Sequence, residues 1–460
     1  MSKKIDMLNA YEFARMFKEA RDGAYLDEVP TGSVNDDYES RPKTYHRVNP
    51  LIESYLHDET GTLTDTDWQD AIFRTALSTK HALSVSAKTK SFNYYIGANY
   101  LYRQGTIIGS DFERYGLRAN LDGKKKHLKY GVSLSPSFSK THYVNSDSQY
   151  GGDGVIASAL MAPPVFPVYN EDGSYNWDMN GLLRIEPWDT QANEVLNPVA
   201  LALEISDVRQ KLNLVGNAYA SYEFIKGLEY KLTLGGDYYS YLRDYYRPSS
   251  IPFKGKNYID AASQPSAASY KNSYFHWNIT NQISFNRTFG DHSVNAVAVY
   301  EAEKMSTQTS QIKGDGIIGD DKIKTTAGKT IDPDNTYNNV YAYTFASWLV
   351  RGQYSYKGRY MVSASIRGDG SSRFAPKKRW GYFPAASVGW RISDEEFMKN
   401  ASWLNDMKIR ASVGQTGNAQ IGNSAYLMLY GTANTDLGAG LTTTAARLSR
   451  TNTSRNTWQR

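Results

Sequence analysis

One segment of the chain, from Trp380 to Ile392, alternates between apolar and polar residues with almost no error. Successive side chains of a β-strand point to opposite faces, so this segment would have two very different sides. The apolar side holds Trp380, Tyr382, Pro384, Ala386, Val388, Trp390 and Ile392. Indole and phenol rings sit well at the two headgroup levels of a bilayer. The pattern is therefore typical of a strand that crosses a membrane.

The same alternation recurs along most of the chain. It predicts about twelve strands of an antiparallel transmembrane β-barrel, an all-β fold. The mean hydropathy is -0.56, and no apolar run reaches the length of about 20 residues that a transmembrane helix needs. The predicted strands lie at 83–87, 94–100, 115–121, 128–138, 212–222, 228–234, 277–285, 294–300, 348–356, 360–366, 380–392 and 407–413.

The connections between these segments alternate in length. Short ones are expected near 88–90, 123–126, 225–227, 289–291 and 357–359, and long ones near 141–206, 244–269 and 305–339. Intermediate ones, at about 103–110 and 369–379, fall on the long-loop side. One larger turn carries a small helix near 397–399, which Ser393 and Glu396 would cap. In up-and-down order the short and long connections lie at opposite ends, as periplasmic turns and external loops do in outer-membrane barrels.

Residues 1–78 differ from the strand region and are predicted to be an external loop region. Asn9 and Glu12 have the spacing of a capping box, so a short amphipathic helix is expected from about Ala10 to Arg21. Residues 79–417 would form the barrel strands with their long loops. Residues 418–460 are polar and are expected to be external loop and irregular tail.

The sequence gives little support to several classes of function. The chain has no cysteine and a formal net charge of +5, which is too small to favour nucleic-acid binding. We expect no catalytic set, no cofactor and no metal centre. The acidic loop 313–334 could hold calcium, although its spacing does not match an EF-hand.

The long loop 141–206 contains the candidate binding residues. Sugar rings are held by aromatic faces beside planar polar groups. Four aromatic residues there could contact a substrate, and they are Tyr169, Tyr175, Trp177 and Trp188. Alternatively, these rings pack the loop itself.

The residues alone are also compatible with two other classes of protein. A soluble β-rich carbohydrate-binding or adhesive protein would bury the apolar faces against a second sheet. An outer-membrane enzyme would need a nucleophile, a base and an orienting acid brought together at the rim.

Particular motifs resemble the SusC/RagA family of TonB-dependent (TonB-linked) outer-membrane transporters. The similarity covers most of residues 1–425 in the expected order. Its motifs are MLNAYEFA at 7–14, TDWQDAIF at 66–73, GSDFERY at 109–115, IRGDGSSRF at 366–374, RWGYFP at 379–384, GWRIS at 389–393, WL at 403–404 and GQTGN at 414–418.

The resemblance implies a plugged barrel of about 22 strands in the outer membrane of a Gram-negative bacterium. Such a barrel would import oligosaccharides or peptides with energy passed through TonB, beneath a SusD-like surface lipoprotein. Against that pattern we expect an internal barrel fragment, without the signal peptide, the TonB-contacting segment, the plug or the first and last strands. The fragment should therefore form an open or incompletely closed sheet that cannot transport by the family's mechanism alone.

Overall fold

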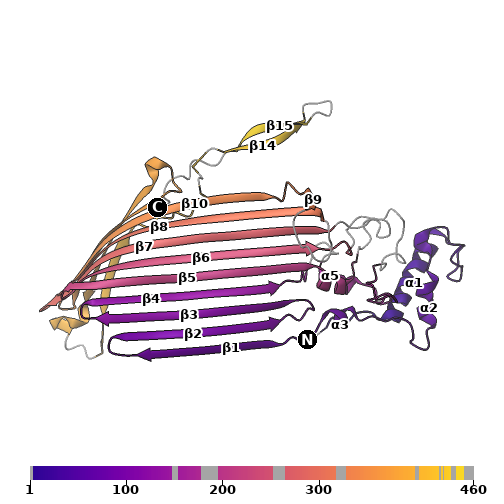
Figure 1. The fold of residues 1–460 in the computed structure, drawn as a ribbon, viewed down its shortest axis with the longest axis horizontal. Helices are drawn as coiled ribbons and strands as arrows, with labels where there is room; N and C mark the ends of the chain where they lie inside the picture. Colours follow the sequence, from indigo (N-terminus) through magenta and orange to yellow (C-terminus); the bar gives the residue numbers. More distant parts are fainter. Residues whose placement is uncertain are drawn as a thin grey trace.

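A computed structural model describes residues 4–147, 154–177, 195–251, 265–317, 328–398, 403–423, 426–427, 429–436 and 442–449. Its main feature is one curved sheet of 13 strands, in which every pair is antiparallel (Figure 1). The strands of this sheet are β1 (Ser78–Lys88), β2 (Phe92–Gln104), β3 (Asp111–Lys125), β4 (Leu128–His142), β5 (Ser206–Ile225), β6 (Leu228–Arg247), β7 (Ser266–Phe289), β8 (His292–Ile317), β9 (Gly328–Ile331), β10 (Tyr337–Tyr356), β11 (Tyr360–Ser371), β12 (Trp380–Arg391) and β13 (Lys408–Gly414).

The helices are few and short, and most lie in the connections at one end of the sheet (Figure 1). No helix within the described ranges is long and apolar enough to cross a membrane. The helices are α1 (Ala10–Glu28), η1 (Thr44–His46), α2 (Pro50–Ser54), η2 (Tyr55–His57), α3 (Trp68–Ile72), α4 (Val155–Met161), α5 (Pro198–Glu204), η3 (Pro376–Lys378), η4 (Ile392–Asp394) and η5 (Glu396–Met398).

The strand order follows the sequence, as in an up-and-down barrel. Each strand pairs with its sequence neighbour from β1 to β13, with the short β9 attached to β8 alone. The sheet is open, because β1 and β13 are its two ends and do not pair with each other. The predicted all-β, antiparallel and incompletely closed fold is confirmed, and each predicted segment contributes to one of the twelve longer strands.

Several strands run farther toward the long loops than the sequence predicts. β8 continues to Ile317 and β10 begins at Tyr337, although the loop was expected to cover 305–339. The reason is that the ladder of backbone hydrogen bonds continues where the hydropathy alternation stops. Tyr337 pairs with the polar residue Gln311, so alternation between apolar and polar residues does not reveal this part of the strand.

The opposite end of the sheet has the predicted short turns. Lys126 and Lys357 lie in two of these turns with positive φ angles of 52° and 54°. The larger turn between β12 and β13 contains the 3₁₀ helices η4 and η5. The small helix expected near 397–399 is thus a 3₁₀ turn over its described part, and residue 399 lies outside the described ranges.

The two faces of the sheet differ in chemistry, and we call them the apolar face and the polar face. Val350, Val362 and Val388 mark the apolar face, where Val388 is 56% exposed. Ser387 lies on the polar face, where its hydroxyl is 2.8 Å from that of Ser363. No second sheet within the described residues covers the apolar face, so the fold does not support the soluble β-rich alternative.

Aromatic rings on the apolar face lie over glycines of the adjacent strand. A Cβ atom added to Gly368 would come within 2.5 Å of the Trp348 indole, and one on Gly370 within 2.8 Å of the Trp380 indole. Glycine at these positions leaves room for a ring to lie across the neighbouring strand. The Trp348 ring also lies 6.1 Å from that of Tyr382, so the rings form a belt near the long-loop end.

Two parts of the chain differ from the sequence-based expectation. In the tail expected to be irregular, β14 (Leu429–Asp436) and β15 (Thr442–Ser449) form an antiparallel hairpin apart from the main sheet (Figure 1). Helix α1 extends to Glu28 instead of ending near Arg21. Buried contacts of Tyr25 and an ion pair of Asp22 hold its second half, and they outweigh the helix-weakening effect of Gly23.

Candidate functional site

The polar face carries a regular array of large polar side chains near the long-loop end. Residues directly opposite each other on paired strands share a face, so the register defines rows across the sheet. One row contains Arg209, Arg243, Tyr270, Gln311 and Tyr337. Another row, four residues farther from the loops on β5, contains Asn213, Tyr239, Tyr274, Thr307 and Tyr341.

We call the densest part of this array the tyrosine–arginine panel. Within it, the rings of Tyr239 and Tyr274 stack at 5.3 Å, and those of Tyr241 and Tyr270 meet edge to face at 5.8 Å. The ammonium of Lys211 also lies 5.7 Å from the centre of the Tyr241 ring. The panel comprises Tyr143, Asp207, Arg209, Lys211, Tyr239, Tyr241, Arg243, Tyr270 and Tyr274.

Asp207 organises the part of the panel that lies nearest the loops. Its carboxylate accepts hydrogen bonds from Nε and Nη2 of Arg209 at 3.0 and 2.9 Å. It also accepts hydrogen bonds from Nε and Nη2 of Arg243, at 3.0 and 2.8 Å. The Arg209 guanidinium lies 3.4 Å from the centre of the Tyr143 ring. The side chain of Asp207 is buried, so this carboxylate fixes two arginines in place.

A pocket of about 310 Å³ opens beside these arginines. Leu201 of α5 and Ile205 contribute apolar lining. Helix α5 lies at the end of the sheet that carries the long loops (Figure 1). The other lining residues of the pocket are Tyr143, Val144, Asn145, Asp207, Arg209, Arg243, Tyr245 and Arg247.

Beyond the strands, helices α1 to α5 and their connections pack into a separate core, which we call the cap. Trp68 is 3% exposed, and its indole Nε1 donates a hydrogen bond of 3.0 Å to the carbonyl of Pro163. The phenol of Tyr55 likewise donates to the carbonyl of Val165 at 2.9 Å. Segments about 100 residues apart are thereby joined in one folded unit.

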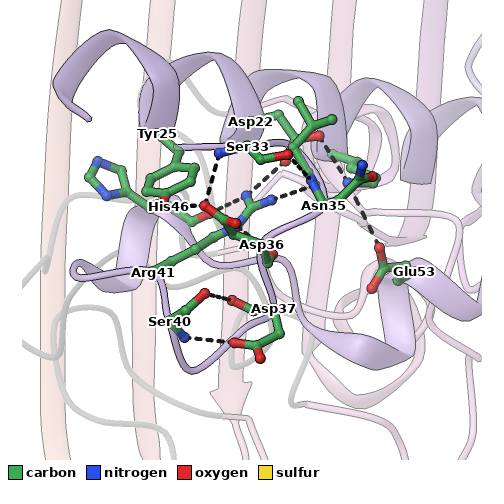
Figure 2. Close-up of polar contacts among 12 residues, drawn as sticks. Asp22, Tyr25, Ser33, Asn35, Asp36, Asp37, Ser40, Arg41, His46 and Glu53 are labelled. Atoms are coloured by element: carbon green, nitrogen blue, oxygen red, sulfur yellow. Dashed lines mark hydrogen bonds and ion pairs between the residues drawn. The ribbon is translucent and has the colours of Figure 1, made fainter. Parts of the chain in front are cut away.

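Polar contacts also hold the first part of the cap together, and Figure 2 shows Arg41 among them. The Arg41 guanidinium is almost fully buried and lies 2.7 Å from the Asp22 carboxylate. It donates further hydrogen bonds to the carbonyls of His46 and Val34 at 2.8 and 3.0 Å. A buried arginine is tolerated only when charge and donors are satisfied in this way.

Two ionisable groups of the same network have shifted pKa values. The backbone N–H of Ser33 and the phenol of Tyr25 donate to Asp36 and lower the pKa of its carboxyl. The same hydrogen bond to Asp36 raises the pKa of Tyr25. Both shifts favour the ionised carboxylate beside the neutral phenol at neutral pH.

The structure brings three of the four predicted loop aromatics together. The Tyr175 ring lies 5.2 Å from that of Tyr169 and 6.1 Å from that of Trp177. Tyr175 and Trp177 pack against the cap core, whereas Tyr169 is 48% exposed. Burial raises the pKa of Tyr175 to about 12. Trp188 lies outside the described residues, and contact of these rings with a substrate stays a prediction.

Sequence reasoning missed the tyrosine–arginine panel. Along residues 239–247 every second residue is a tyrosine or arginine on the polar face, but polar residues occur on both sides of the strand there. A search for alternating aromatic residues, instead of alternating hydropathy, would have extended β6 to Arg247.

The acidic loop offers no metal centre in its described part. Asp332 pairs with Lys313 at 2.8 Å, and this hydrogen bond lowers the pKa of Asp332 to about 2. No group of three or more histidine, aspartate or glutamate residues suited to a metal occurs within the described ranges. Asp320 and Asp321 of the same loop lie outside those ranges.

The chain is similar to several known proteins, although no family model matches it. It is 29% identical over 416 residues to the TonB-dependent receptor P3 of Formosa agariphila, an alignment that covers 85% of this chain and 39% of that protein. It is also 29% identical to the TonB-dependent receptor SusC of Bacteroides thetaiotaomicron, over 83% of this chain and 38% of SusC.

Among solved structures, the RagAB peptide transporter has the same fold. The TM-score is 0.68 at 19% identity, and the match covers 98% of this chain and 49% of that one. The chain thus spans about half the length of the RagAB chain and about two fifths of the curated relatives.

Long antiparallel strands with an apolar outer face, together with these similarities, define an outer-membrane β-barrel protein of a Gram-negative bacterium. The resemblance to the SusC/RagA family of TonB-dependent transporters is confirmed. The chain is similar in sequence and in fold to part of such a barrel.

Proposed function

We propose that the chain forms part of the wall of an outer-membrane importer of large nutrients, either oligosaccharides or peptides. The polar face would line the lumen, and the cap would lie on the external side. The proposed division is an external loop region at 1–78, barrel strands at 79–417 and external segments at 418–460. The role is transport without catalysis, in keeping with relatives that are named as receptors and transporters.

The observation that carries this proposal is the contrast between the two faces of long strands. The apolar face suits lipid, and the polar face, which carries tyrosine, arginine, serine and threonine, would be turned toward the lumen. A wall of this kind permits a polar solute to pass while its exterior stays in the bilayer.

We further propose that the importer works with a SusD-like surface lipoprotein and draws energy through TonB. The well-packed cap provides an ordered external surface on which such a lipoprotein could rest. The names of the relatives support TonB dependence, since two of them are TonB-dependent receptors.

Deletion of the gene tests the function directly. Cells lacking the protein should lose uptake of one class of oligosaccharide or peptide, and a copy of the gene should restore it. Uptake should also stop when the proton gradient of the inner membrane is dissipated. Unchanged uptake of every oligosaccharide and peptide that the parent strain uses would refute the importer function.

A further inference from the structure

We infer that the tyrosine–arginine panel binds an oligosaccharide that carries acidic groups, such as carboxylates. This inference rests on the proposed import function and narrows its substrate class. Neither the names of the relatives nor the four loop aromatics assign a role to this surface.

The charges of the panel favour an anionic ligand. Asp207 is the carboxylate that Arg209 and Arg243 share, so it neutralises one of their two positive charges. Lys211 lies in the next row and is exposed, with its ammonium 5.7 Å from the centre of the Tyr241 ring. Within the panel, positive charge therefore exceeds negative charge. A fixed guanidinium can bind a carboxylate through two parallel hydrogen bonds.

The rings of the panel favour a sugar over a peptide as the bearer of that charge. Tyrosine rings supply flat apolar surface with a polar edge, which suits the faces of pyranose rings. Four rings lie on the adjacent strands β6 and β7: Tyr270 belongs to the arginine row, Tyr241 to the next row, and Tyr239 and Tyr274 to the row after that. The cations and the rings thus lie along one path that leads from the 310 Å³ pocket into the polar face.

Three variants separate this role from a purely structural one. Lys211→Gln removes an exposed cation and should weaken binding of an acidic oligosaccharide by about two- to fivefold, as for an exposed ion pair. Asp207→Asn removes the negative charge that offsets one arginine but keeps an amide oxygen that accepts hydrogen bonds from the arginines, so it should tighten the same binding. Lys231→Gln is the matched control, because Lys231 lies over Tyr219 at 4.6 Å on the same face, about 34 Å nearer the turns.

The experiment uses protein extracted in detergent from the outer membranes of its own cells. Calorimetry would compare six-unit oligogalacturonate, neutral maltohexaose and hexaglutamate at low and high salt. We expect oligogalacturonate to bind most tightly, with an affinity that falls as salt rises. Lys231→Gln should leave all three affinities unchanged.

Equal binding of the charged and neutral sugars would overturn the inference, and so would tighter binding of the peptide. Failure of Lys211→Gln to weaken binding of oligogalacturonate would overturn it as well, even if Asp207→Asn did not assemble. Binding is measured without transport, so the two proposals can fail separately. Selective binding of acidic sugar by a protein whose deletion leaves uptake intact would refute the import function alone.

Discussion

Replacing Ala386 with arginine tests the assignment of the apolar face to lipid. Ala386 lies on β12 between Trp380 and Trp390, the two rings expected at the headgroup levels. Ten residue steps of about 3.4 Å, tilted by about 40°, span about 26 Å of membrane, which matches the apolar band of about 25 Å. Ala386 is one residue from the midpoint, or about 3 Å from the midplane.

The expected cost follows from that depth. An arginine on the lipid face near the midplane costs about 2–4 kcal/mol, whereas one near the interface costs about 0–1 kcal/mol. Across the strands Ala386 faces Ala364 and Val413, which offer no counter-charge. The variant should therefore lower the folded-to-unfolded ratio by about 30- to 1000-fold.

Two matched variants make the result specific. Ser387→Arg places the same side chain one residue along, on the polar face, where it should cost about 1 kcal/mol through loss of the hydrogen bond to Ser363. Ile409→Arg lies opposite Trp390, at the membrane interface, and should cost about 0–1 kcal/mol.

The assay is urea unfolding of the protein in lipid vesicles, supported by the amount of assembled protein in the outer membrane. If Ala386→Arg and Ser387→Arg destabilise equally, the apolar face does not contact lipid. A cost at Ile409 equal to that at Ala386 would instead refute the placement of the two tryptophans at the interfaces.

Three further predictions concern the cap and the ring belt. Asn9→Ala should destabilise the start of α1 by about 1 kcal/mol, seen as faster amide exchange in its first turn, while Asn9→Ser should not. Gly368→Ala should cost about 1–3 kcal/mol in urea unfolding by displacing an indole, unlike Gly352→Ala, whose Cβ meets nothing within 4 Å. The folded state lowers the pKa of Asp36, so this group stabilises the cap above pH 3.8, and the contribution is lost as the pH falls through the folded pKa. Asp36→Asn should therefore reduce the loss of cap stability at acid pH, measured by amide exchange corrected for intrinsic rates. An unchanged pH dependence would refute the role of Asp36.

The sequence by itself determined the class of fold and the positions of its strands. Alternation between apolar and polar residues predicts a strand where one side meets lipid and the other meets water. Lipid favours apolar side chains and water favours polar ones, and successive residues face the two in turn. For that reason the sequence predicts the strand at 380–392 and eleven others. The lengths of the connections between them predict which end of the sheet carries the short turns. The capping box at Asn9 was also predicted, because it depends on local contacts alone.

The sequence could not locate the site in the same way. Above the membrane both faces of β6 and β8 meet water, so hydropathy no longer alternates although the strands continue. Apart from Tyr143, which follows β4, the panel is formed by residues of β5, β6 and β7, which meet only through the register of the sheet. Asp207 and Arg243 lie 36 positions apart in sequence yet form hydrogen bonds.

Tertiary structure likewise decided the length of α1 and the role of the loop aromatics. The second half of α1 is held by Arg41, whose contact with Asp22 is not a local one. Tyr175 and Trp177 pack against the cap, a placement that depends on segments on both sides of the first four strands. The order of residues alone determines which side of a strand is apolar, whereas contacts between residues distant in sequence form only when the sheet and the cap have folded.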